Sequence, residues 1–286
     1  MYTPLLSIVV INHNTKEMTT KTIDAIIHTT KNTIFEVIVV DNSSKQEEFF
    51  SYDDERVRTF LHVENKGFAH GCNYGVERSK GDLVLFLNSD TEVCESAIDK
   101  SVNCIVKDTH IGAVGIKTIL RDGSFDAACK RGFPTPFASL SYFLGLEKKF
   151  PKSRIFGKYH LTYLSNTENC EVDAIAGAFL LMRKDLFQEL GGFDEQFFMY
   201  GEDLDLCMKI KLSGHSILYL SDAIMIHYKR QSGLAQNNPK IIDAFYDSMK
   251  IFYNKYYKQK YPKFLTWLIM KSIDFRHHHT IRKQNT

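Results

Sequence analysis

The hydrophobic residues of the chain fall into short continuous runs separated by segments with helical spacing. Four apolar, β-rich runs occur in the first third of the chain, over 5–11, 35–40, 57–63 and 83–87. Between them, residues 16–29 and 68–78 carry apolar side chains at spacings typical of short helices. A strand that is apolar on both faces is typical of a buried parallel sheet. The alternation therefore predicts an α/β fold, with a mostly parallel sheet flanked by helices.

The second half of the chain has a weaker pattern. Four more strands are expected, over 112–120, 172–182, 216–220 and 223–226. Residues 121–124 are a predicted turn, because Asp-Gly adopts positive φ at little cost, and a helix is predicted over 201–214. Residues 130–168 contain three prolines and many aromatic residues but no clean period. We interpret them as an irregular insertion and a candidate lid.

Polar side chains follow the last residue of several predicted strands. They are Asn12 and Asn14, Asp41, Asn65, and Asn88 with Asp90. Ligands of parallel α/β sheets bind beyond the carboxyl ends of the strands, so we expect these residues to meet at one edge. Two roles stay open for Asp41. Its carboxylate either accepts the imide N–H of uracil or thymine, or caps a turn through bonds to the backbone.

The segment from Asn65 to Gly75 contains three glycines at four-residue spacing, Gly67, Gly71 and Gly75. Asn65 and Asn73 add amide groups without a fixed charge. A glycine inside a helix costs about 1 kcal/mol relative to alanine, so three of them need a reason. Either the helix packs closely on the sheet, or a ligand approaches it. We favour a wall of a nucleotide-sugar site.

Asn88-Ser89-Asp90-Thr91 is the candidate site for a cation and a diphosphate. Mg²⁺ and Mn²⁺ bind oxygen ligands, often one or two carboxylates together with substrate phosphates. Asp90 supplies a carboxylate, whereas Asn88 is a weaker, neutral oxygen donor. His227 follows a predicted strand and is a further candidate metal ligand. By itself a lone histidine is more often structural, and only the companion motifs favour the ligand role.

An acidic cluster opens the helix predicted over 201–214, with Glu202, Asp203 and Asp205 in its first turn. The favourable interaction of acidic side chains with the helix dipole explains why three acids stand in the first turn. It does not account for the aromatic approach over 197–200, which would shelter them from water. A sheltered carboxylate has a raised proton affinity, which suits a general base. We assign Asp203 as the base, with Glu202 orienting the second substrate or serving as the alternative base.

Composition narrows the function class. The net charge of +2 gives no global positive field, so we expect no nucleic-acid partner. Six cysteines without a CxxC pair indicate neither a disulfide framework nor a thiolate zinc site. We find no apolar run of membrane-spanning length and no features of a signal peptide near the first residues. We therefore expect a cytoplasmic protein.

The last fifty residues differ in composition from the rest. Residues 243–260 are rich in Phe, Tyr and Lys, and an apolar stretch over 264–270 follows. We predict a helical, aromatic and basic extension over 236–286 behind a single α/β domain over 1–235. Such helices either lie on a membrane, here its inner face, or pack as a pair on the domain. Helices of the two kinds have the same hydrophobic periodicity, so peripheral membrane association stays open.

Several segments together resemble a known family. They are SIVVINHN, VIVVDNSS, NKGFAHGCNYG, FLNSD, AGAFLLMRKDLF, GGFDEQFFMYGEDLDL and the later His227. In order and spacing they resemble inverting family 2 glycosyltransferases, within them the bacterial rhamnosyltransferase-like group. The resemblance implies a GT-A fold, a nucleoside-diphosphate-sugar donor, and Mg²⁺ or Mn²⁺. The family's DxD motif falls on 88–90, so Asn88 replaces its first acid and leaves the strength of metal dependence open.

The resemblance also implies roles for individual residues. The family base corresponds to Asp203. The nucleotide-sugar contacts correspond to Asn12, Asn14, Asp41, Asn65, Gly67, Phe68, Asn73, Asn88 and Asp90. The acceptor side corresponds to Ala176, Gly177 and Gly201, with the 130–168 insertion beside it.

The predicted function is transfer of a sugar with inversion, in particular rhamnose from dTDP-rhamnose. The expected acceptor is a hydroxyl of a cell-surface polysaccharide, a lipopolysaccharide or a lipid-linked glycan. A metal-dependent nucleotidyltransferase is one alternative, but it would normally carry a glycine-rich, basic loop where Asn12-His13-Asn14 stands. A non-catalytic nucleotide-sugar binding module is the other.

Overall fold

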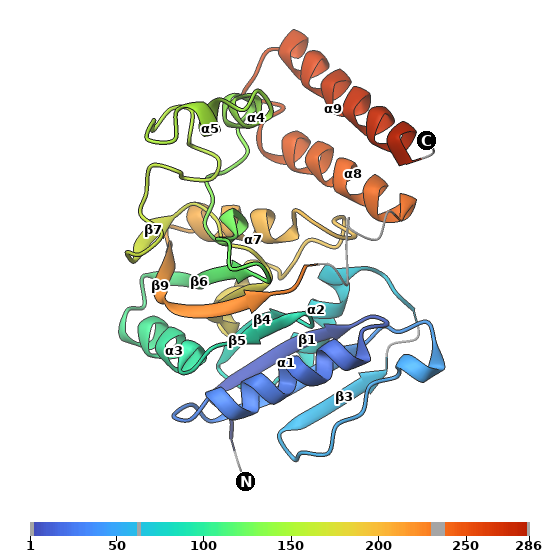
Figure 1. The fold of residues 1–286 in the computed structure, drawn as a ribbon, viewed down its shortest axis with the longest axis vertical. Helices are drawn as coiled ribbons and strands as arrows, with labels where there is room; N and C mark the ends of the chain where they lie inside the picture. Colours follow the sequence, from blue (N-terminus) through green and yellow to red (C-terminus); the bar gives the residue numbers. More distant parts are fainter. Residues whose placement is uncertain (1–2, 62–63, 230–237, 285–286) are drawn as a thin grey trace.

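The computed structural model describes residues 3–61, 64–229 and 238–284. Its described residues form a nine-stranded sheet in the order β3-β2-β1-β4-β8-β6-β9-β5, with β7 paired to β9 (Figure 1). The strands are β1 Leu6–Asn12, β2 Phe35–Asp41, β3 Val57–Leu61, β4 Leu83–Asn88, β5 Thr91–Val93, β6 Ile111–Leu120, β7 Cys170–Val172, β8 Phe179–Arg183 and β9 Ser216–His227. The pairs among β1 to β4 are parallel, as is β6 with β9, whereas β8, β5 and β7 pair antiparallel.

Helices cover both faces of the sheet. On one face lie α1 (Lys16–Thr29) and α3 (Ala97–Lys107), and on the other α2 (Phe68–Glu77), α6 (Lys184–Glu189) and α7 (Glu202–Leu212). Side chains of β1 alternate between the two cores, because successive residues of a strand point to opposite faces. Ile8 and Val10 pack with α1 and α3, whereas Val9 packs with α2. The predicted α/β architecture, a sheet flanked by helices, is confirmed. The sheet is mixed, because its parallel pairs among β1 to β4 and between β6 and β9 are accompanied by the antiparallel pairs of β5, β7 and β8.

Two glycines of α2 explain how this helix reaches β1. A Cβ atom at Gly75 would lie 2.5 Å from Val9 Cγ1, and one at Gly71 would lie 3.1 Å from Ile11 Cδ1. These positions need glycine because the helix packs closely on the strand. The ligand-wall interpretation that we favoured is therefore wrong for Gly71 and Gly75, and the packing alternative is right.

Three expected elements differ in the structure. Residues 216–220 and 223–226 form one strand, β9, whose register against β6 shifts between Ile116 and Lys117. Such an irregularity interrupts the alternation and makes one strand read as two. Instead of one strand over 172–182 the structure has two, β7 and β8, and the loop between them ends at Phe179 beside Leu87 of β4. The 130–168 segment is not wholly irregular, because it contains α4 (Pro136–Phe143) and α5 (Leu146–Lys149).

The start of α4 carries a signal that was present in the sequence. The Thr135 hydroxyl accepts a hydrogen bond from the Ala138 N–H, and Pro136 occupies the first helical position. Both are common at helix N-termini. Two short 3₁₀ turns, η1 (Gln46–Glu48) and η2 (Ala127–Cys129), complete the domain.

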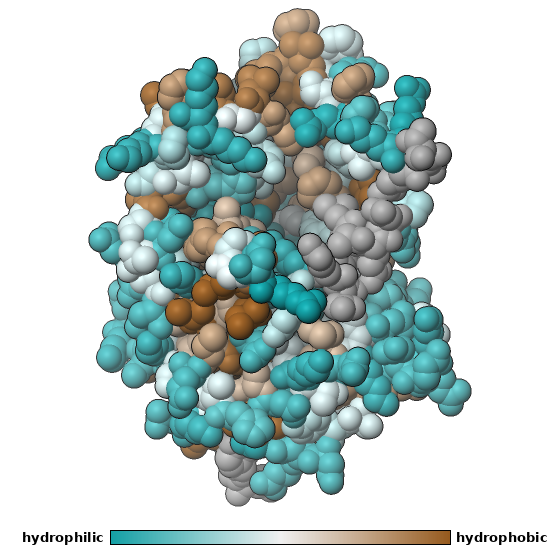
Figure 2. Space-filling view, viewed as in Figure 1, coloured by the Kyte–Doolittle hydropathy of each residue, from teal (hydrophilic) through white to brown (hydrophobic). Residues whose placement is uncertain are grey.

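The C-terminal helices α8 (Pro239–Tyr256) and α9 (Lys263–Gln284) pack as a pair beside α7 (Figure 1). The Tyr256 hydroxyl of α8 donates to Asp205 of α7 at 2.7 Å, and Tyr246 of α8 lies 2.7 Å from Thr280 of α9. The packed-pair alternative thus describes α8. Hydrophobic side chains remain on the surface where α9 begins, at the top of Figure 2. Among the described residues, we find no helix with the length and apolar character to cross a membrane.

Candidate active site at the carboxyl edge of the sheet

The predicted site residues meet at the carboxyl edge of the parallel strands. Asn12 at the end of β1 is paired with Asp41 at the end of β2, and Asn88 ends β4 beside Ile11. Because β8 is antiparallel, it begins at this same edge and brings the preceding loop there. His227 ends β9, paired with Thr91. The sequence-based prediction of convergence at one edge is confirmed.

Asn12 and Asp41 form a buried hydrogen-bonded pair. The Asn12 amide donates to Asp41 at 2.9 Å, to the Ser43 hydroxyl at 2.9 Å and to the Glu48 carbonyl at 3.1 Å. The Asp41 carboxylate also accepts the backbone N–H groups of Ser43 and Phe50. Both side chains are almost fully buried. The turn-capping role of Asp41 is therefore what this structure contains, and its contact with a base stays a prediction.

Three further asparagines shape the loops around the edge. The Asn14 side chain accepts the N–H groups of Ser44 and Lys45. Asn65 accepts the N–H of Gly67. Asn73 donates to the Phe193 carbonyl at 3.0 Å and to the Glu195 carboxylate at 2.9 Å, and accepts the Phe193 N–H. Its amide thus ties α2 to the loop that leads to the acidic cluster.

Asp90 and His227 are in direct contact. Their Oδ1 and Nε2 atoms lie 3.1 Å apart, and the Asn88 amide nitrogen lies 3.4 Å from the same Nε2. Both Asp90 and His227 are buried. The turn that carries Asp90 is held from α1, because the Thr22 hydroxyl bonds to the carbonyls of Ser89 and Thr91.

Asp126 is a member of this group that the sequence did not reveal. Its Oδ2 lies 3.9 Å from Nδ1 of His227 and 2.7 Å from Nζ of Lys229. Burial alone would lower the pKa of His227. Its contacts with Asp126 and Asp90 raise the pKa by more than burial lowers it, so the pKa of His227 lies above its ordinary value. Burial would raise the pKa of Asp126, yet His227 and Lys229 hold it well below its usual range. In the sequence Asp126 is one acid after a turn, with no motif around it.

The side chains around Asp90 could hold Mg²⁺ or Mn²⁺ only if oxygen atoms of a bound substrate supplied further ligands. Within the described ranges, no group of three or more His, Cys, Asp or Glu side chains could hold a metal ion. Sites for Mg²⁺ typically use one or two carboxylates and leave the remaining positions to phosphate oxygens and water. Asp90 and His227 fit that pattern. Asp126 faces the other ring nitrogen of His227, as carboxylates behind metal-bound histidines commonly do.

Asp203 is held by three donors. Its Oδ2 accepts the Arg131 guanidinium at 2.7 Å and the Gly177 N–H at 3.1 Å, and its Oδ1 accepts the Leu204 N–H at 2.7 Å. Arg131 also donates to the Ile175 carbonyl at 3.2 Å. Burial alone would lower the pKa of Arg131, but Asp203 together with Tyr159 and Cys207 raises it by more, so the pKa of Arg131 lies above its ordinary value. Sequence reasoning missed Arg131, because an isolated arginine in the 130–168 segment carries no signal.

Glu202 is the acid that is sheltered from water. Burial, followed by the negative charge of Asp203, raises the pKa of Glu202 to about 8. Within the described residues its Oε2 has no hydrogen-bond partner. The prediction that an acid of this cluster is sheltered from water is therefore confirmed, but the sheltered acid is Glu202 and not Asp203. Asp205 is different again, since its fully buried side chain binds Tyr256, Lys255 and Lys209, mostly from α8.

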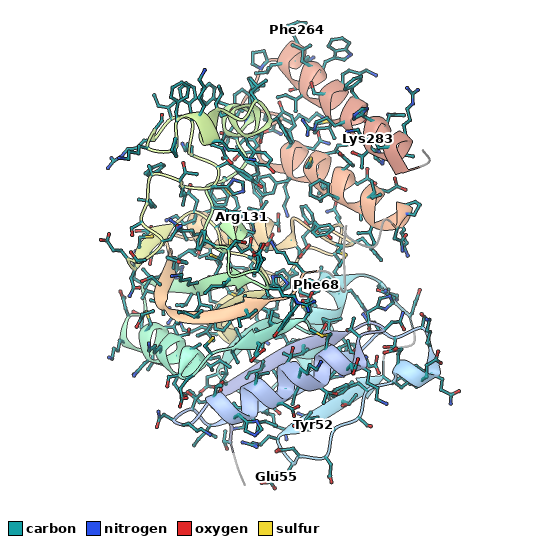
Figure 3. The ribbon with its side chains drawn as sticks, in the orientation of Figure 1. Tyr52, Glu55, Phe68, Arg131, Phe264 and Lys283 are labelled. Atoms are coloured by element: carbon teal, nitrogen blue, oxygen red, sulfur yellow. The ribbon has the colours of Figure 1, made fainter. Side chains whose placement is uncertain are left out.

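The loop over 176–178 joins the two groups. The Ala178 carbonyl accepts the Asn88 N–H at 3.2 Å, while the Gly177 N–H reaches Asp203. The Phe68 ring lies beside Gly177, 3.8 Å from the position of a Cβ there. Gly201, with φ of +82°, precedes α7 against the Phe197 ring. Asp90 and Asp203 thus share one edge. Figure 3 labels two residues of this region, Arg131, which contacts Asp203, and Phe68, which lies beside Gly177.

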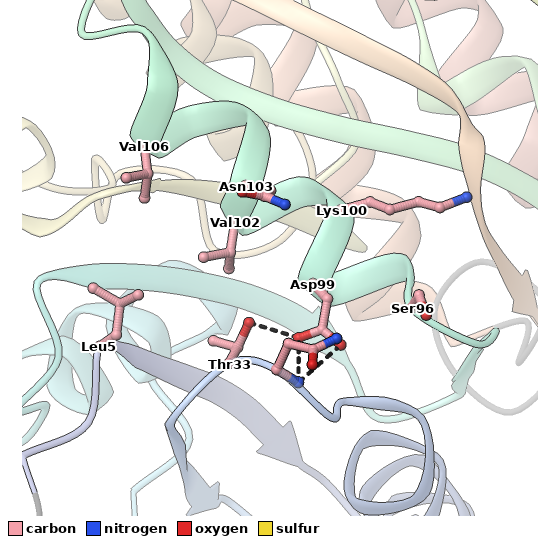
Figure 4. A pocket seen from close by; sticks show the side chains of 9 residues that line it. Leu5, Thr33, Ser96, Asp99, Lys100, Val102, Asn103 and Val106 are labelled. Carbon is pink, nitrogen blue, oxygen red and sulfur yellow. Dashed lines mark hydrogen bonds between the residues drawn. The ribbon is translucent and has the colours of Figure 1, made fainter.

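A hollow at the opposite edge of the sheet is structural (Figure 4). It lies between the start of β1 and α3, and includes Leu5, Val102, Val106 and Asp99. The Asp99 carboxylate accepts the N–H groups of Lys31 and Asn32 and the Thr33 hydroxyl. It fixes the loop before β2 onto α3 and is remote from the strand ends that carry the candidate chemistry.

The comparison with protein families agrees with this geometry. The model of the glycosyltransferase-like family 2 matches residues 4–238. The chain belongs to this family. Among its relatives, it is 28% identical over 245 residues to the O-antigen biosynthesis protein RfbC of Myxococcus xanthus, covering 83% of this chain and 18% of that one. It is 26% identical over 201 residues to the N-acetylglucosaminyl-diphospho-decaprenol L-rhamnosyltransferase of Mycobacterium tuberculosis, covering 70% of this chain and 64% of that enzyme. The chain thus spans less than two thirds of either relative.

A solved structure shares the fold. GalNAc-T7 with UDP, GalNAc and Mn²⁺ superposes with a TM-score of 0.62 at 20% identity, over 86% of this chain and 48% of that one. The identity is low, so this likeness concerns the fold alone. Together with the family match it confirms the predicted GT-A architecture with added C-terminal helices.

Proposed function

We propose that this family 2 chain transfers a sugar from a nucleoside-diphosphate donor to a hydroxyl, with inversion at the anomeric carbon. The observation that carries the proposal is the placement of Asp90–His227 and Asp203 at one edge, bridged by the 176–178 loop. A departing diphosphate and an attacking hydroxyl need these two kinds of group on opposite sides of the reacting carbon.

On the donor side, Asp90 and His227 would hold Mg²⁺ or Mn²⁺ together with the diphosphate. The bound cation would neutralise the negative charge that develops on the leaving group. Asn14, Asn65, Gly67 and Phe68 line the adjoining loops, where we place the nucleoside and sugar. We assign supporting roles behind them to Asn12 and Asp41, which are almost fully buried and bonded to each other, and to Asn73, which holds the loop before the acidic cluster.

On the acceptor side, Asp203 accepts the proton of the attacking hydroxyl at its carboxylate. Arg131 and the Gly177 N–H fix the carboxylate orientation through the bonds described above. Glu202 is largely protonated near pH 7, given its raised pKa of about 8. A protonated carboxyl donates a hydrogen bond, so we assign Glu202 to orienting the acceptor beside Ala176 and Gly201.

We further propose rhamnose from dTDP-rhamnose as the donor sugar, and a surface or lipid-linked glycan as the acceptor. The names of the two relatives support this choice, one concerned with O-antigen biosynthesis and one with L-rhamnose transfer to a lipid-linked sugar. The fold itself does not select a sugar.

The test is a screen of nucleotide sugars by thermal shift, with and without Mn²⁺, followed by product analysis. A ligand that binds the native state raises the melting temperature. We expect the largest shift with dTDP-rhamnose and Mn²⁺, and a product whose anomeric configuration, read by NMR, is opposite to that of the donor. Retention of configuration would refute the mechanism. Binding without turnover for every acceptor tried would favour the non-catalytic module.

A further inference from the structure

One end of the molecule exposes an unusual concentration of hydrophobic side chains. Eleven of the sixteen large hydrophobic side chains exposed in the described chain lie on α4, on residues 144–155 or on α9. They include Phe137, Leu140 and Phe143 of α4 and Phe264, Trp267 and Phe275 of α9. We call this surface the α4–α9 face. Its hydrophobic atoms gather at the top of Figure 2, over the beginning of α9.

The two helices contribute to one continuous surface. The Arg276 guanidinium of α9 lies over the Phe143 ring of α4, 3.9 Å from its centroid. The inner side of α9 is already covered, because Ile269 and Met270 pack on the core beneath. Its outer side carries Phe264, Trp267 and Phe275. Helix α9 is thus apolar on two sides, and packing against α8 accounts for only one of them.

The excess of positive charge in the chain lies at this same end. Residues 136–158 and 258–284 contain twelve Lys and Arg residues but two acids, Glu147 and Asp274. Both acids are in contact with a basic group, Glu147 with His160 and Asp274 with Lys250. The rest of the chain holds the other 24 basic and 32 acidic residues, so its net charge is negative. The modest overall charge therefore hides a strongly basic end.

We propose that the α4–α9 face docks on the surface of a bilayer that contains anionic lipids. Aromatic rings with basic side chains around them suit the boundary between headgroups and acyl chains. Lys and Arg near such a surface are attracted by its negative potential. A second copy of this chain fits less well, because two copies of so basic a face would repel each other.

Docking in this way has a consequence for the site, which rests on the proposed function. The segment that enters α4 begins near Arg131, and Arg131 contacts Asp203. Helix α8, beneath α9, binds Asp205 of the same acidic helix. The basic face is therefore tied to the acceptor side of the site, where a lipid-linked acceptor would arrive.

The chain supplies its own reporter for a test. Trp267 is the single tryptophan of the sequence and lies 56% exposed on the α4–α9 face. The full-length protein is titrated with vesicles of phosphatidylcholine, with and without phosphatidylglycerol, while Trp267 emission is recorded. We expect a blue shift, quenching by lipids brominated on the acyl chain, and co-sedimentation, all with the anionic vesicles and weakened by salt. These readouts need no nucleotide sugar, so they are independent of the proposed activity.

Variants locate the contact. Phe264→Ser with Phe275→Ser, and separately Lys271→Glu with Arg282→Glu, should each weaken vesicle affinity about tenfold or more. The control is Leu212→Ser, which removes an equally exposed apolar side chain (71%) outside the face and should bind as wild type does. Equal binding to vesicles without phosphatidylglycerol would overturn the proposal. So would unchanged Trp267 emission, or dimerisation that buries Trp267 without any vesicle binding.

Discussion

The donor side and the acceptor side of the candidate site are built in different ways. On the donor side, Asn12, Asp41 and Asn88 stand at the ends of neighbouring strands, and Asn12 and Asp41 bond to each other and to the loop after β2. On the acceptor side, Arg131, Gly177 and Asp203 come from three separate segments and meet through side-chain and loop contacts. The comparison teaches that regular strand pairing preorganises the donor half, whereas packing of irregular segments assembles the acceptor half.

The largest effect is expected at the acceptor side. Asp203→Asn removes the proposed proton acceptor while keeping the side-chain size, so kcat should fall by about 10²- to 10⁴-fold. Donor affinity should stay close to wild type, because the hydrogen bonds of Asp203 described above go to Arg131, Gly177 and Leu204, and none of these residues belongs to the donor side. Steady-state kinetics with donor and acceptor varied in turn measure both. Turnover near the wild-type rate would remove Asp203 from the mechanism.

The donor side should respond with linked losses of binding. Asp90→Ala removes the carboxylate beside His227, and we expect affinity for donor and Mn²⁺ to fall together, with activity lower by about a hundredfold. Isothermal titration with and without Mn²⁺ separates the two. Full wild-type activity in EDTA would show that no cation takes part, and Asp90 would then lose its assigned role.

A smaller loss is expected behind the metal ligand. Asp126→Asn leaves Asp90 and His227 in place but removes the charge facing the second nitrogen of His227. Such outer partners typically contribute about 10- to 100-fold in metal affinity. Mn²⁺ titrations of this variant are compared with Asp122→Asn, a nearby acid in an exposed turn. Identical Mn²⁺ affinity in both variants would leave Asp126 a structural role only.

The last effect is on stability rather than on activity, and it has a definite sign. Glu202 has an ordinary pKa of 4.5 and a folded-state pKa of about 8, so between these values the folded state binds more protons than the unfolded one. The free energy of unfolding should therefore fall as pH rises from about 5 to 8, by roughly a few kcal/mol. Glu202→Gln should lose this dependence. Denaturant unfolding at several pH values decides, and parallel profiles for the two proteins would contradict the buried, protonated state.

The success of sequence reasoning differed along the chain for a physical reason. The apolar runs that became β1, β2 and β4 were correctly predicted as strands, because burial on both faces leaves an unbroken pattern. The run that became β3 was also correctly predicted as a strand, although β3 is a partly exposed strand at the end of the sheet. The hydrophobic pattern did not predict β9 as one strand, because a register shift interrupts the alternation there. It did not predict α4 either, because the signal of this helix is the capping pair Thr135-Pro136 and not a hydrophobic period.

The local sequence determined which strands form and hence which polar residues reach the carboxyl edge, because strand direction and side-chain alternation follow from consecutive residues. It also determined that acids open α7. Only the tertiary structure decided which acid is paired with Arg131, and which one is buried with a carboxylate oxygen that has no hydrogen-bond partner among the described residues. It also decided that Asp126 stands behind His227. These outcomes depend on contacts between residues distant in the chain. Their burial and electrostatics arise only once the segments have packed together.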